Sequence, residues 1–190
     1  MVKDTINQII GGLGNQLYAV ATQQINSSTS KVEYELASTV ERVLSVTVDY
    51  DRTYNDVEYI RRWKFAPQSG SFTSKKALYV YEPLVTGSKL QVTHFRKPVT
   101  LSDGQSFSDS LLPSTSYDVI ILGAASRLMA TSASYLSSSR SVETNVLDGA
   151  QNTNQVLQQS RYLFTLFQQR LEEEKTQLLN TYVTRSHYTG

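Results

Sequence analysis

The sequence predicts a mainly α-helical fold: a small helical bundle with a β-hairpin-rich insertion and an extended C-terminal tail. Three observations lead to this prediction. Apolar residues recur at helical spacing over residues 114–136 and again over residues 155–183. Short runs rich in β-branched and aromatic residues occupy residues 57–98. Residues 184–190 follow no apolar pattern and are typical of an exposed tail.

The composition is that of one domain with little surface charge. A chain of 190 residues is most simply a single domain, here residues 1–183. Only 18% of the residues are charged and the formal net charge is +1, so the whole molecule is not an electrostatic trap for nucleic acid. Ordinary solvation by serine and threonine explains such a surface. Packing against identical neighbours is the alternative, which the 12 tyrosines favour because tyrosine combines contact area with a polar end.

Two helices are expected before the β-rich insertion. The first covers residues 4–10, where Asp4 caps the free N–H groups and the glycines that follow end the helix. The second covers residues 31–46, where Ser30 and Glu33 form a capping-box pattern. The last residues of this segment are β-branched, so its end can also be extended.

The middle of the chain has the alternation of a β region. Around Trp63, aromatic and charged residues alternate as they do in a strand. Two further runs, KALYVYE and KLQVTHFR, are joined by a segment that contains Gly87, which is the pattern of a hairpin. Pro98 ends the second run, and an irregular loop leads to the next helix.

Two longer helices complete the predicted bundle. The helix over residues 114–136 begins after Pro113 and carries Asp118 in its first turn, where the helix dipole favours a negative charge. The helix over residues 155–183 repeats leucine and phenylalanine every seven residues. We expect these two helices to pack against each other, and a coiled coil with a partner is the alternative.

No pattern in the sequence predicts catalysis or metal binding. Gly11, Gly12 and Gly14 follow no strand and precede no Gly-Lys-Ser/Thr sequence, so they indicate a helix end rather than a phosphate loop. His94 and His187 have no carboxylate or serine at the spacing of a triad or a ligand set. The absence of cysteine excludes disulfides and thiolate sites. We therefore expect no enzyme, no metal and no cofactor, and we interpret the three consecutive glutamates after residue 171 as a solvated helix face.

Basic residues crowd the β region, and Trp63 and several tyrosines lie between them. This pattern is typical of a surface that contacts an acidic protein or passing nucleic acid. Charged side chains also protect exposed strand edges from unwanted pairing, so both explanations stay open. The candidate contact residues are Arg61, Arg62, Lys64, Lys75, Lys76, Lys89, Arg96 and Lys97.

Four segments follow one another in a recognisable order. They are the run WKFAPQSG, the hairpin ALYVYEPLVTGSKLQVTHFRKP, the segment LLPSTSYDVIILGAASRLMA, and a long helix with a polar tail. This order resembles the head-to-tail adaptor proteins of tailed bacteriophages over residues 4–183. The resemblance implies a structural virion protein without enzymatic activity, located in the neck of the particle and assembled in the host cytoplasm.

The resemblance also implies partners. Adaptors of this kind form a ring, usually of twelve copies, between the portal and the stopper or tail-completion protein, and they extend the DNA channel. Their C-terminal segments dock on the portal, which makes Tyr182, Arg185, His187 and Tyr188 the contact candidates here. We expect no membrane partner. Two other functions stay open: another neck protein, such as a stopper or tail-completion protein, and a nucleic-acid-binding module that uses the basic β region.

Overall fold

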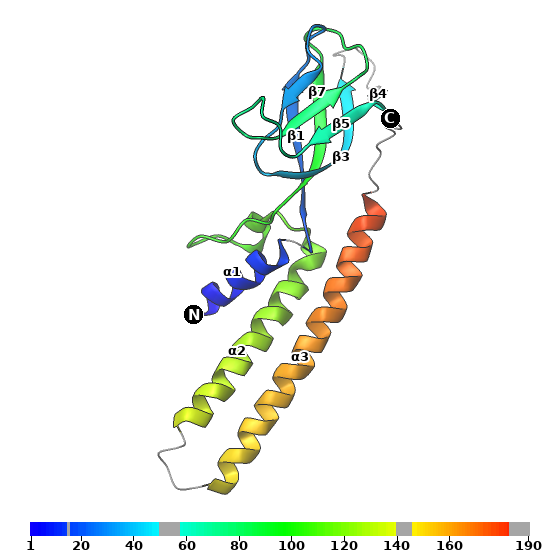
Figure 1. The fold of residues 1–190 in the computed structure, drawn as a ribbon. Coiled ribbons are helices and arrows are strands. Elements are labelled where there is room, and N and C mark those ends of the chain that lie inside the picture. The colour runs from blue at the N-terminus through cyan, green and yellow to red at the C-terminus, as the bar shows by residue number, and fades with distance from the viewer. Residues whose placement is uncertain (15, 50–57, 140–145, 183–190) are drawn as a thin grey trace. The chain divides into compact units, whose positions relative to one another are not determined.

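The structure is a computed structural model, and it describes residues 1–14, 16–49, 58–139 and 146–182. The chain divides into two compact units (Figure 1). The helical unit contains Met1–Leu17 and Pro98–Leu178, and the β unit contains Tyr18–Lys97 and the chain from Leu179. The sequence was expected to form a single domain, whereas its internal contacts form these two groups.

The prediction of a mainly helical bundle is wrong, because the fold is mixed α/β with two antiparallel sheets. The clearest difference lies at residues 31–46, which were predicted to be helical. They hold β2 (Glu33–Glu35) and most of β3 (Val40–Asp49). The capping box does not form, since the Glu33 carboxylate instead accepts a hydrogen bond from the Tyr79 hydroxyl at 2.8 Å. The β-branched residues of β3 pack well in a sheet, and their burial there outweighs the local helical pattern.

The helical unit is built around two long neighbouring helices, α2 and α3 (Figure 1). Its elements are α1 (Val2–Leu13), the short 3-10 helices η1 (Phe107–Ser110) and η2 (Ser114–Ser116), α2 (Tyr117–Ser139), and α3 (Val146–Thr181). The helix α2 covers most of the predicted range 114–136, with η2 forming the turn before it. The predicted start of the last helix at residue 155 is wrong, because α3 already begins at Val146. The Ser160 hydroxyl of α3 donates a hydrogen bond of 2.8 Å to the Ser126 carbonyl of α2, so the two helices approach closely there.

A buried carboxylate ties α3 to the start of α2. Glu174 is 4% exposed, and its Oε2 accepts hydrogen bonds from the hydroxyls of Thr115 and Ser116, each at 3.0 Å. Its Oε1 accepts a hydrogen bond of 3.0 Å from Arg170, which also donates to Asp118 at 2.7 Å. The hydrogen bond to Asp118 is the largest cause of the raised pKa of Arg170. We call these five residues the polar cluster. The prediction of a solvated face is therefore wrong for Glu174.

The β unit is a sandwich of two antiparallel sheets with the strand orders β1-β7-β3-β4 and β2-β6-β5. The remaining strands are β1 (Ala19–Asn26), β4 (Glu58–Tyr59), β5 (Trp63–Ala66), β6 (Ala77–Val80) and β7 (Lys89–Arg96). The hairpin predicted from the runs KALYVYE and KLQVTHFR does not form, because β6 and β7 belong to different sheets. Gly87 lies between them with a φ of 90°, a conformation that favours glycine.

The sandwich core explains why β6 and β7 separate. Leu78 and Val80 of β6 and Leu90 and Val92 of β7 are all buried in one apolar cluster. Two facing sheets can bury all four side chains in a common core, whereas a two-stranded hairpin alone is at best marginally stable in water. The core also contains Trp63, whose indole Nε1 has no hydrogen-bond partner among the described residues.

The free energy of unfolding is expected to fall as the pH drops below about 6.5, the ordinary pKa of histidine. Burial lowers the pKa of His94, whose Nδ1 lies 3.2 Å from the Val92 carbonyl oxygen. At a pH between the pKa values of His94 in the folded and unfolded states, the unfolded chain binds a proton that the folded chain does not bind, so lowering the pH there favours unfolding. Above the pKa of His94 in the unfolded chain, this side chain makes no pH-dependent contribution to the free energy of unfolding.

Urea unfolding at pH 7.5 and 5.5 measures this effect above the range in which the carboxylates titrate. The loss of stability at the lower pH should be smaller in His94→Gln than in the parent chain. An equal loss in both proteins would show that another group is responsible.

Candidate functional site

The helix α1 forms one wall of the candidate site. Ile9, Ile10 and Leu13 are buried on one face of α1, which is strongly amphipathic. The sequence predicts that the helix ends at its glycines, but Gly11 and Gly12 lie inside the last turn and are exposed. A Cβ atom at Gly12 would meet nothing within 4 Å. The surface of α1 therefore stays open at this position.

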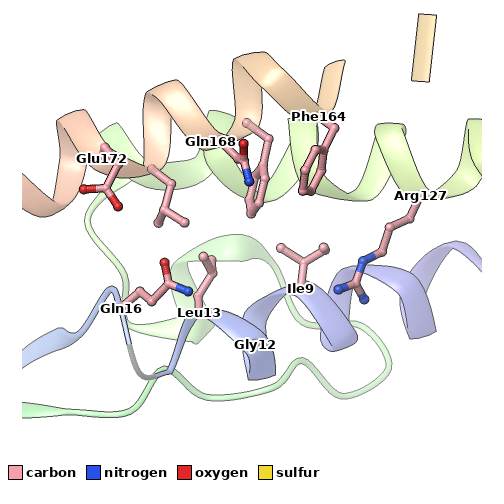
Figure 2. A pocket seen from close by; sticks show the side chains of 10 residues that line it. Ile9, Gly12, Leu13, Gln16, Arg127, Phe164, Gln168 and Glu172 are labelled. Carbon is pink, nitrogen blue, oxygen red and sulfur yellow. The ribbon is translucent and has the colours of Figure 1, made fainter. Parts of the chain in front are cut away.

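A groove of about 410 Å³ lies between α1, α2 and α3. It is lined by Ile9, Gly12, Leu13, Gln16, Arg127, Phe164, Phe167, Gln168, Leu171 and Glu172. Figure 2 shows Phe164 and Gln168 reaching from α3 toward Ile9 and Leu13 of α1. We call this feature the α1–α3 groove.

The floor of the groove depends on a close approach between α2 and α3. A Cβ atom at Gly123 would lie 3.0 Å from two ring carbons of Phe167 and 3.1 Å from Cδ1 of Ile9. Any larger side chain at Gly123 would therefore push against the floor. The sequence signal for this packing is the run of small residues in α2, which indicates close helix approach but not which partner approaches.

The rim of the groove is polar and carries both signs of charge. Arg127 lies at one end, with its Nη1 3.5 Å from Oε1 of Gln8, and Glu172 lies at the other end, where Lys175 pairs with it at 3.2 Å (Figure 2). Within the described ranges, no group of three or more His, Cys, Asp or Glu residues is placed to hold a metal ion. The groove thus offers an apolar floor with hydrogen-bonding groups above it, which suits binding of an apolar or aromatic side chain.

Large apolar side chains are exposed on the same unit. Phe164 at the groove is 49% exposed and Ile121 on α2 is 52% exposed. Tyr162 on α3 is 65% exposed, and Tyr135 near the end of α2 is 72% exposed. The sequence places these residues on helices but does not show that the fold leaves them uncovered.

The eight candidate basic residues belong to, or directly precede or follow, strands of two different sheets. The first group lies in the sheet β2-β6-β5: Arg61 and Arg62 directly before β5, Lys64 on β5, and Lys75 and Lys76 directly before β6. The second group lies in the other sheet: Lys89 at the start of β7, Arg96 at its end, and Lys97 directly after it.

Carboxylates that accept hydrogen bonds lie among the residues of the first basic group. The Glu82 carboxylate accepts hydrogen bonds from the backbone N–H groups of Arg61 and Arg62 at 2.7 and 2.6 Å. Across the sheet, Lys64 pairs in register with Tyr79, and Tyr79 pairs with Glu33. The hydrogen bond from the Tyr79 hydroxyl is the largest cause of the lowered pKa of Glu33, so this carboxylate stays charged in the same sheet as the lysine, two strands away. Such mixed charge fits edge protection better than a phosphate-binding surface.

Of the four predicted docking residues, only Tyr182 lies within the described residues. It is partly exposed, and its ring contacts Phe95 edge-on, with centroids 6.3 Å apart. Arg185, His187 and Tyr188 lie outside the described residues.

Comparisons with known proteins found no matching family model and no matching curated protein. No helix in the described part of the chain is long and apolar enough to cross a membrane.

Proposed function

We propose that this chain is a structural subunit that assembles with copies of itself into a closed ring, as a head-to-tail adaptor in the neck of a tailed bacteriophage. In this role it is not an enzyme and needs no cofactor. The ring, of about twelve copies as the resemblance implies, would join the portal to the stopper or tail-completion protein and extend the DNA channel. It would reach the virion after assembly in the host cytoplasm.

One observation carries the proposal: the helical unit leaves large apolar side chains exposed, one of them at an open groove and others on further helix faces. Large apolar side chains left in contact with water on several faces are covered when a subunit packs against other proteins. Phe164, Tyr162 and Ile121 are each about half exposed or more. A subunit flanked by copies of itself would cover these side chains.

The low surface charge supports the same proposal. Charged residues are depleted from the cores of protein interfaces, and tyrosine is enriched there. With 18% charged residues and 12 tyrosines, the chain has little charge to desolvate when copies meet. The resemblance of the segment order to phage adaptors supplies the location in the virion.

The β unit favours a second candidate within the same virion. Stopper and tail-completion proteins are more often small β-barrels, and here the strands form a sandwich with its own core. The long helices α2 and α3 favour the adaptor. A nucleic-acid-binding module is not favoured, because the basic residues are divided between two sheets.

Sedimentation of the purified full chain over a concentration series tests the proposal. We expect the monomer to convert into one large species of defined size, because a ring that closes by rotation stops growing. A monomer at every concentration would contradict the proposal.

The C-terminal segment is expected to be required for joining the portal. Deletion of residues 183–190 keeps Tyr182 and its contact with Phe95, so the β unit should remain folded. The shortened chain should nevertheless fail to join portal-bearing capsids, because the proposed docking residues Arg185, His187 and Tyr188 are lost. Co-sedimentation with capsids measures this, and circular dichroism controls for folding. Normal joining by the shortened chain would refute the docking assignment.

A further inference from the structure

We propose that the α1–α3 groove receives Tyr162 from α3 of a second copy of this chain. The inference rests on the self-assembly proposed above and names the contact through which it occurs.

Tyr162 lies on an exposed stretch of α3 in which the residues one and two turns away on the same side carry no charge. It is the most exposed large apolar residue of that helix within the described residues, at 65%. The neighbouring positions on the same face are Gln155, Gln158, Thr165 and Gln169, and all four are exposed. Covering amides and hydroxyls costs less than covering charges. This face therefore has the composition of an interface centred on one tyrosine.

Tyr162 and the groove lie on opposite sides of α3. The residues of α3 that line the groove include Phe164, Gln168 and Leu171. An α-helix turns about 100° per residue, so Tyr162 points about 200° away from Phe164. One subunit thus has an aromatic side chain on one side and a receiving groove on the other. This arrangement gives a head-to-tail contact, and repeated head-to-tail contacts form a ring when the rotation closes.

The groove matches the chemistry of a tyrosine. Its floor includes Leu13 and Phe167, and the rings of Phe164 and Phe167 lie 6.0 Å apart, so an incoming ring meets aromatic surfaces. The side-chain amides of Gln16 and Gln168 at the rim can hydrogen-bond the phenolic hydroxyl. The volume of about 410 Å³ lies in the range of ligand pockets, so the groove has room for a tyrosine side chain.

Two variants remove one side of this contact each. Tyr162→Ala removes the inserted ring, and Gly12→Leu extends a side chain into the groove from α1, where an added Cβ atom meets no other atom within 4 Å. Each variant should raise the concentration needed for assembly by about 30-fold or more, the loss expected of an interface hot spot. Tyr162→Phe should retain most of the assembly. Tyr59→Ala, which removes an exposed tyrosine from the β unit, is the matched control and should assemble normally.

A mixture of the two variants tests the direction of the contact. Tyr162→Ala has an intact groove and Gly12→Leu has an intact Tyr162, so an equimolar mixture should form dimers and nothing larger. A mixture that stays monomeric, although the parent chain assembles, would overturn the inference and leave the proposed function standing. A parent chain that never assembles would overturn both.

Disulfide cross-linking provides an independent measurement, because the chain has no cysteine of its own. A chain carrying both Gly12→Cys and Gln158→Cys keeps Tyr162, and it should form a ladder of linked multimers under oxidation, because Gln158 is exposed one turn from Tyr162 on the same face of α3. Each single variant should stay unlinked, and their mixture should give dimers only. Dimers of Gln158→Cys alone would show a two-fold contact and overturn the inference.

Discussion

Replacement of Arg170 by methionine is expected to lower the free energy of unfolding of the chain by about 2–3 kcal/mol, somewhat less than the loss typical of a broken buried ion pair because the arginine is partly exposed. Glu174 would keep its hydrogen bonds to Thr115 and Ser116 but lose its cationic partner. Its buried charge would then be uncompensated. Urea unfolding followed by circular dichroism measures the change.

Two further variants establish the cause of this loss. Glu172→Gln breaks only the exposed pair with Lys175, so stability should change by less than about 1 kcal/mol. Combining Arg170→Met with Glu174→Leu removes the isolated charge together with its partner, and it should restore part of the stability. If the double variant is less stable than Arg170→Met alone, the buried charge is not the reason for the loss.

Replacement of Gly123 by leucine is expected to destabilise the helical unit by about 1–3 kcal/mol, the range seen for overpacked cores. The first added carbon already lies 3.0 Å from the Phe167 ring and 3.1 Å from Ile9. The rest of the side chain would separate α2 from its neighbours and distort the floor of the α1–α3 groove. Thermal unfolding measures the loss of stability, and sedimentation should show impaired assembly.

Gly12→Leu is the matched control for this prediction. It adds the same side chain in the same helical unit, but at a groove-lining position where an added Cβ atom has open space. Leucine has a higher helix propensity than glycine by up to about 1 kcal/mol, so the folded chain should be as stable as the parent or slightly more stable. Equal destabilisation by Gly12→Leu and Gly123→Leu would contradict the close packing described at Gly123.

The sequence predicts the helices of this fold better than its sheets. The apolar spacing in α2 and α3 and the start of α2 near Pro113 are local features, so they can be recognised without knowing the fold. The segment 31–46 carries a helical pattern and β-branched residues together. The strand forms because the sheet β2-β6-β5, which includes residues far from β3 in the sequence, buries the apolar side chains of β3 in a common core. The local sequence does not display these contacts.

Strand partners and buried charges depend on contacts that the sequence does not display. The runs that become β6 and β7 are neighbours in sequence, but their inward residues belong to opposite walls of the sandwich. Glu174 looks like its solvated neighbours Glu172 and Glu173 until Ser116 and Arg170 are placed beside it. The α1–α3 groove is hidden for the same reason, since its walls come from residues more than a hundred positions apart.

Electron micrographs of the purified full chain at an assembling concentration test the central claim most directly. We expect end-on views of closed rings of one size with an open centre, formed by repetition of a single head-to-tail contact. Solitary particles, or filaments that grow without closing, would contradict the claim that this chain acts as a ring-forming subunit.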